Sequence, residues 1–261
     1  MPYSIHTKEY IQDAINLKTC PLNDNDKILL AYSKETGLVR LVAKGVKKTK
    51  SKLASYVESL VANKLFCKSG RSLDIISSAS SLNTFKNIRN DIVKLIFSMY
   101  LSEIVINFGV EKDPNSLQIY NLLFNALKQI ANTNFKLDFL LVTLRFQLKM
   151  MKISGFDLDF YFCVDCGKPI DDMNNAYYSY NQHGMICSKC KMSNLSKTML
   201  INKKIIEFLN TLKKSDFNEN TYYDKMASEK ICKNCFLFLY KYIEFHSNKK
   251  FKTIQTLEEI L

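Results

Sequence analysis

The chain has 261 residues, with 37 lysine and arginine side chains against 25 aspartate and glutamate side chains, and a formal net charge of +12. With 47% hydrophobic residues it can bury a sizeable core, which excludes an intrinsically disordered chain. The seven glycines lie too far apart for a phosphate-cradling loop, and three histidines leave little material for a histidine-based catalytic site. We therefore expect a binding protein rather than an enzyme.

The strongly basic balance favours nucleic acid or an anionic membrane surface as the partner. Charged residues interrupt the longest apolar stretches, and the first ten residues lack the apolar core of a signal peptide. The sequence therefore predicts a cytoplasmic protein without a membrane span. In that compartment the eight cysteines are expected to be metal ligands or free thiols, not disulfides.

Short apolar runs separated by turn residues fill the first 82 residues, without a helical period. The clearest predicted strands cover residues 27–33, 37–43, 57–68 and 71–76. About five strands in this length indicate a small barrel or sandwich, and the five-stranded OB barrel is one fold of matching size.

A helical period begins after about residue 84. Helices are predicted at 88–108, from Asp113-Pro114-Asn115 onward, and at 137–153, 197–212 and 228–246, with a cysteine-rich loop segment at about 160–193. We expect an α+β multidomain protein. Residues 1–82 form the OB-type β-barrel, and residues 83–261 form an all-α domain that carries the cysteine module.

Four cysteines form two Cys-x2-Cys pairs separated by 20 residues: Cys163, Cys166, Cys187 and Cys190. Each pair can hold one side of a tetrahedral ion, and thiolate ligands suit Zn²⁺. Four protein ligands leave no position for a reactive water, so the sequence predicts one structural zinc ion. His183, four residues before Cys187, is an alternative ligand.

The remaining cysteines are less informative. Cys232 and Cys235 share one face of the predicted helix at 228–246, so they are either buried thiols or a second metal or redox site. Cys20 and Cys67 are isolated and are expected to fill positions inside the barrel.

A basic stretch without any acid joins two predicted strands. The candidate DNA-binding residues are Arg40, Lys44, Lys47, Lys48, Lys50 and Lys52. Clustered lysines can follow a phosphate backbone, although a solvated loop that only aids solubility has the same composition. Tyr32, Tyr56 and Phe66 are candidate stacking platforms or, alternatively, core residues.

Several motifs occur in an order that resembles the RecO family of bacterial recombination mediators and single-strand annealing proteins. They are Ala43-Lys44-Gly45 followed by Ser51-Lys52-Leu53, then Leu144–Leu148 with Ser154-Gly155-Phe156, the two cysteine pairs, and Tyr242–His246. The resemblance covers about residues 8–252. The chain departs from it in about six additional amino-terminal residues, in a loosely matched turn at Asp24-Asn25-Asp26, and in Cys232 and Cys235.

The resemblance implies an amino-terminal OB barrel, a helical domain with a zinc module, and a nucleoid-associated protein. It implies binding of single- and double-stranded DNA, strand annealing, and loading of RecA onto DNA coated by single-strand binding protein (SSB). The implied partners are RecR and the acidic SSB tail, with RecF and RecA as indirect partners.

Two other function classes fit parts of the sequence. A zinc-ribbon OB-fold factor that binds RNA or RNA polymerase shares the zinc, the charge and the barrel. A nuclease would need clustered carboxylates for metal ions. Asp157 with Asp159, and Asp171 with Asp172, are the nearest candidates, but both pairs are more typical of turns and caps.

Overall fold

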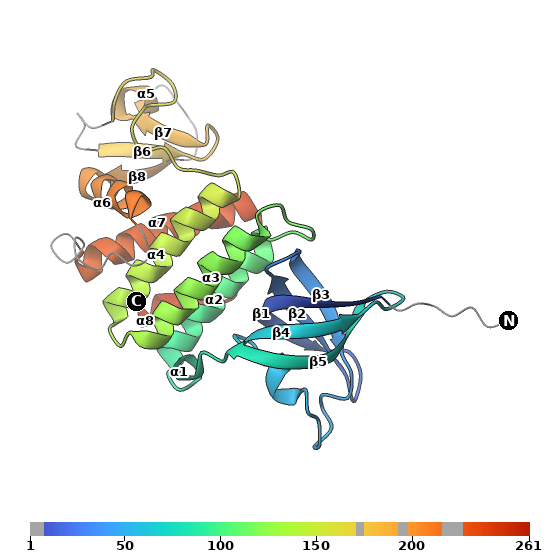
Figure 1. Cartoon of the computed structure of the whole chain (residues 1–261). Coiled ribbons are helices and arrows are strands. Elements are labelled where there is room, and N and C mark those ends of the chain that lie inside the picture. Colours follow the sequence, from blue (N-terminus) through green and yellow to red (C-terminus); the bar gives the residue numbers. More distant parts are fainter. Residues whose placement is uncertain (1–7, 171–174, 193–197, 216–226) are drawn as a thin grey trace. The chain divides into compact units, whose positions relative to one another are not determined.

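The structure is a computed structural model that describes residues 8–170, 175–192, 198–215 and 227–261. The chain forms two compact units, one from residues 1–134 together with 251–261 and the other from residues 135–250 (Figure 1). This division differs from the domain boundary expected at residue 82, which stays a prediction. None of the helices within the described ranges is long and apolar enough to cross a membrane.

Five strands of the first unit close into a barrel in the order β1-β2-β3-β5-β4, which confirms the predicted OB-type barrel. Neighbouring strands are antiparallel except β3 and β5, which are parallel. The elements are β1 (Glu9–Pro21), β2 (Lys27–Ser33), β3 (Gly37–Ala43), the 3-10 helix η1 (Ala54–Val57), β4 (Ala62–Lys68) and β5 (Asp74–Asn83). The strand expected from residue 57 therefore begins later, because residues 54–57 form η1.

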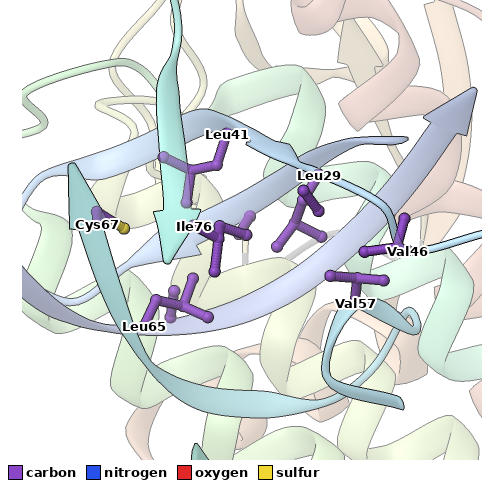
Figure 2. Packing of buried hydrophobic residues seen from close by; sticks show 10 residues of the cluster. Leu29, Leu41, Val46, Val57, Leu65, Cys67 and Ile76 are labelled. Atoms are coloured by element: carbon purple, nitrogen blue, oxygen red, sulfur yellow. The ribbon is translucent and has the colours of Figure 1, made fainter. Parts of the chain in front are cut away.

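The barrel core consists of side chains that alternate along the strands, as the two-residue period of a strand requires. Figure 2 shows seven of them pointing toward one another: Leu29, Leu41, Val46, Val57, Leu65, Cys67 and Ile76. Two of these, Val46 and Val57, come from the connection between β3 and β4 and not from a strand. This connection therefore contributes to the barrel core.

The helices of the first unit are α1 (Lys86–Arg89), α2 (Ile92–Phe108), α3 (Ser116–Asn132) and α8 (Ile254–Ile260). The turn between β2 and β3 is joined to the connection between α2 and α3. Asp113 accepts a hydrogen bond from the buried Tyr32 hydroxyl at 2.8 Å, and Leu38 N donates to Val110 O at 2.9 Å. Gly37 has a φ of +81°, and a Cβ there would lie 2.5 Å from Val110 O, so only glycine fits this close approach.

The carboxyl-terminal segment returns to the first unit. Glu103 of α2 accepts hydrogen bonds from the backbone N–H groups of Lys252 (2.8 Å) and Thr253 (3.1 Å), and from the Thr253 hydroxyl (2.7 Å). These bonds satisfy donors at the start of α8, whose Ile254 and Leu257 are buried. The sequence pattern did not predict this helix.

The described residues of the second unit form three long helices and a small sheet. Its elements are α4 (Lys136–Ile153), β6 (Asn175–Ser179), β7 (Gly184–Cys187), α5 (Ser188–Met192), β8 (Thr198–Asn202), α6 (Lys203–Lys214) and α7 (Glu229–Ser247). The sheet order is β7-β6-β8, with antiparallel pairs. The expectation of a loop segment at 160–193 and a helix from residue 197 was therefore incomplete, because three strands too short for a clear period form there.

Candidate functional site

The four predicted zinc ligands come together in the second unit. Cys163 and Cys166 lie on a turn closed by Gly167, whose N–H donates to Cys163 O at 2.8 Å and whose φ is +66°. Cys187 ends β7, and Cys190 lies in α5. All four Sγ atoms lie within 4.8 Å of one another, and this is the arrangement that two Cys-x2-Cys pairs predict.

The cluster has the dimensions of a tetrahedral zinc site. A Zn–S bond of about 2.3 Å places sulfur atoms about 3.8 Å apart, and the Sγ atoms of Cys166 and Cys187 are 3.9 Å apart. The N–H groups of Cys187 and Cys190 point at Sγ of Cys163 and Cys187, each at 3.4 Å. Such N–H···S contacts stabilise thiolates.

The pKa values of the clustered thiols also favour a bound cation. Burial raises the pKa of the Cys163 thiol, but the N–H groups of Cys187, Cys166 and Asp165 outweigh it and lower that pKa to about 7. Side-chain hydrogen bonds to Cys187 and Cys166 raise the pKa of Cys190. Four adjacent thiols therefore cannot all ionise unless a cation compensates their charge, so the residues present fit Zn²⁺.

His183 lies outside this group of ligands within the described residues. Its ring packs beside Phe245 and His246, with centroids 5.7 Å and 5.4 Å away. Burial lowers the pKa of His246 to about 4, so this neighbouring imidazole is neutral near pH 7.

The other cysteines behave as separate thiols. Cys232 and Cys235 are fully buried on α7 and belong to no group of metal-ligating side chains among the described residues. Burial raises the pKa of Cys232 to about 12 and that of Cys235 further, which favours inert core thiols over a redox pair. Cys67 fills the barrel core as predicted, whereas Cys20 is exposed and that prediction was wrong.

The predicted DNA-binding residues lie on β3 and on the connection after it. Arg40 is exposed on β3, and Lys44, Lys47, Lys48, Lys50 and Lys52 are exposed on residues 44–53, which we call the basic loop. Val46 of this loop is buried in the barrel core, and Leu53 packs against the same core. Apolar side chains therefore anchor the basic loop while its lysines face solvent.

Polar contacts hold both ends of the connection between β3 and β4. At its start, Asp26 Oδ1 accepts a hydrogen bond from Gly45 N at 2.7 Å. At its end, the buried Asn16 side chain donates to the carbonyl oxygens of Tyr56 and Glu58, each at 2.7 Å. The partner Asn63 donates to Tyr56 O at 2.8 Å. A loop with so many fixed points differs from a freely solvated lysine run.

The stacking candidates have different surroundings. Tyr32 is completely buried and donates its hydroxyl proton to Asp113, so it is a core residue. Tyr56 and Phe66 are half-buried and keep part of their rings exposed.

The candidate nuclease carboxylates have structural roles where they are described. Asp157 pairs with Lys213 at 2.8 Å, and Asp159 Oδ1 accepts from Tyr161 N at 2.7 Å. Asp171 and Asp172 lie outside the described residues.

The sequence interpretation did not identify the turn between β1 and β2 (residues 22–26) as part of the site. Asp26 holds Gly45, and Lys47 donates to the Asn23 and Asn25 carbonyl oxygens through Nζ (2.6 Å) and its backbone N–H (3.0 Å). The signal was present in the run Asn23-Asp24-Asn25-Asp26, since asparagine and aspartate favour side-chain-braced turns.

Comparisons with known proteins cover nearly the whole chain. Residues 7–85 match the family model described as recombination protein O N terminal, and residues 89–254 match the model described as recombination protein O C terminal. A protein of Desulforamulus reducens named DNA repair protein RecO is 28% identical over 253 residues, which is 97% of this chain and 95% of that protein. Proteins with the same name from Gloeobacter violaceus and Clostridium novyi are 31% identical over 184 residues and 26% identical over 196 residues. These alignments cover 70% and 75% of this chain and 69% and 75% of those proteins.

Proposed function

Because the chain belongs to the recombination protein O family and is thus a DNA repair protein of the recombination-mediator class, we propose that it binds single- and double-stranded DNA and anneals complementary strands. We also propose that it helps to load RecA onto SSB-coated DNA together with RecR. Family membership favours this function over that of a zinc-ribbon factor for RNA or RNA polymerase.

The observation that carries the DNA-binding proposal is the outward presentation of five lysines on an anchored loop. Lysine contacts phosphate as a point charge and does not read base edges, so binding is expected to be independent of sequence. Annealing requires this property, because two strands repel each other and a shared cationic surface lowers that repulsion. Arg40 on the neighbouring strand β3 would extend the surface.

The cysteine cluster supports a structural role for one Zn²⁺ held by Cys163, Cys166, Cys187 and Cys190. When bound, the ion would neutralise the thiolates and join β7 and α5 to the turn at residues 163–167. Four protein ligands close the coordination shell, so this site would stabilise the second unit and would perform no hydrolysis.

Family membership also supports the partner proposals. RecR and the acidic tail of SSB are the proposed direct partners, with RecF and RecA acting indirectly. The helical domain expected at residues 83–261 is the proposed docking region for protein partners. An SSB lacking its tail should then be captured less well than intact SSB by the immobilised protein, and equal capture of both would contradict the tail contact.

The central test is annealing of two complementary single strands, each coated with SSB. The native chain should anneal them rapidly. A quadruple alanine variant should lose this activity because four phosphate contacts are removed. Its substitutions are at Lys44, Lys47, Lys48 and Lys50. The matched control removes the same charge from exposed lysines elsewhere, at Lys86, Lys128, Lys249 and Lys250. Absence of annealing by a folded, zinc-loaded native chain would contradict the proposal, and equal loss in both variants would contradict the assignment to the basic loop.

A further inference from the structure

An acidic side chain lies inside the basic surface. Asp26 is half-buried at the end of the turn between β1 and β2, where it shares a surface pocket with Lys44, Gly45 and Lys48. A carboxylate beside a phosphate-binding loop repels phosphate, so charge alone predicts that this residue weakens DNA binding.

Hydrogen bonds within residues 22–26 stabilise the turn that carries Asp26. Asn23 Oδ1 accepts from the backbone N–H groups of Asn25 (2.9 Å) and Asp26 (2.8 Å), while Asn23 Nδ2 donates to Asp26 Oδ2 at 2.9 Å. Leu22 N donates to Asp26 O at 3.0 Å. One carboxylate oxygen is thereby fixed within the turn, and the other is left to face the basic loop.

That second oxygen sets the start of the basic loop. Asp26 Oδ1 accepts from Gly45 N at 2.7 Å, and Gly45 has a φ of +66° that turns the chain. From there the loop continues through Lys48 N donating to Gly45 O (3.2 Å) and Ser51 N donating to Lys48 O (3.0 Å). The Asp26 carboxylate therefore fixes the backbone at Gly45, and this in turn orients the neighbouring residues Lys44 and Lys48.

Lys47 belongs to the same arrangement. Its ammonium donates to the Asn23 carbonyl at 2.6 Å, and its backbone N–H donates to Asn25 O at 3.0 Å. Lys47 therefore holds the loop to the turn while its side chain stays exposed, as do those of Lys44 and Lys48.

We propose that Asp26 is a positioning residue for the DNA-binding surface, and that DNA binding needs the oxygen acceptor of this side chain because its hydrogen bond to Gly45 N orders the basic loop. The inference rests on the proposed function. It predicts a sign opposite to simple electrostatics, since removing this acid raises the net positive charge and yet weakens binding. The cause is that DNA must then order the lysine side chains and their backbone at the moment of association.

Asp24 provides a matched control in the same turn. It is exposed, and among the described residues no hydrogen bond joins its side chain to the basic loop. Asp24→Ala and Asp26→Ala change the net charge equally, and they differ in the contact with Gly45. Asp26→Asn removes the charge but keeps an oxygen acceptor for that N–H group.

The experiment measures the affinity of each full-length variant for a fluorescent single-stranded oligonucleotide by anisotropy at fixed salt. Asp26→Ala is expected to bind about threefold to tenfold more weakly than the native chain. Asp24→Ala should bind equally well or about twofold more tightly, and Asp26→Asn should stay within about twofold of native. Thermal melting of each variant verifies that the barrel is folded.

Limited trypsin digestion gives a readout that does not depend on DNA. Cleavage after the loop lysines should accelerate in Asp26→Ala and not in Asp24→Ala, because only the former releases the loop. Unchanged cleavage in Asp26→Ala, or affinity equal to or tighter than that of the native chain, overturns the positioning role while leaving the proposed DNA-binding function intact. Failure of the native chain to bind the strand overturns the proposed function and this inference with it.

Discussion

The cysteine cluster and the basic loop each bring together side chains that repel one another when all are ionised, but different interactions order the two regions. Four thiols within 4.8 Å of one another need a cation to ionise together. The five lysines of the basic loop are exposed, and the loop is ordered by Val46, Leu53 and its contact with Asp26. The proposed zinc ion would therefore order the cysteine region, whereas apolar and polar contacts with the barrel order the basic loop.

This difference explains why one site is simple to locate in the sequence and the other is not. In each Cys-x2-Cys pair only two residues separate the ligands, so the pair can be recognised in a short stretch of sequence. The connection that carries the basic loop is held by contacts between residues 19 to 42 positions apart, whose roles appear only when β1, β2 and β4 are paired.

The largest expected effect comes from removing a zinc ligand. Cys163→Ser should abolish stoichiometric zinc and lower the melting temperature by at least about 10 °C, because structural zinc contributes strongly to folding. Zinc content by atomic absorption and unfolding by circular dichroism test this expectation.

The control for that experiment is Cys20→Ser, which replaces an exposed thiol outside the cluster and should leave zinc content and melting unchanged. A stable, fully folded Cys163→Ser chain without metal would contradict the structural role.

A smaller effect is expected from salt, and it should act on the basic loop alone. If about four lysines contact single-stranded phosphates, the logarithm of the binding constant falls with the logarithm of salt concentration at a slope of about −2.8, or about fiftyfold between 50 and 200 mM. Titrations of labelled single strands measure the slope. The quadruple lysine variant should give a shallower slope, and a salt-independent affinity of the native chain would exclude phosphate contacts as its source.

The smallest expected effect is on an apolar anchor of the connection between β3 and β4, the Val57 side chain of η1. Val57 is 1% exposed, so Val57→Ala should lower the free energy of unfolding by about 1–3 kcal/mol in urea denaturation. Val110→Ala removes the same methyl groups from a side chain that is 53% exposed and should change stability by less than about 0.5 kcal/mol. Equal stability of the two variants would indicate that the connection between β3 and β4 is not part of the barrel core.

Much of the architecture is predictable because its patterns are periodic or closely spaced. Short apolar runs on either side of a turn predict the strands at 27–33 and 37–43, and the two Cys-x2-Cys pairs predict the cluster. The sheet β7-β6-β8 was missed because each strand has only four or five residues, which is too short to reveal a period.

The prediction of Cys20 as a core residue failed for another reason. Cys20 is still paired with Ile28 of β2, but its side chain is exposed near the end of β1, and the residue type alone does not indicate this. Similarly, Asp26 could be predicted as a turn residue, but its bond to Gly45 depends on the pairing of Lys27 with Ala43 across β2 and β3. Contacts between distant residues require the fold before they can be assigned.

The return of residues 251–261 to the first unit has a consequence for synthesis on the ribosome. The strands of the barrel emerge first, yet α8 and its cap at Glu103 cannot form until all of residues 135–250 have been translated. Until then, the surface of the first unit that α8 will cover stays exposed. The second unit, which is inserted in the sequence of the first, can fold during this interval. The four clustered cysteines are thus also synthesised before the first unit is complete.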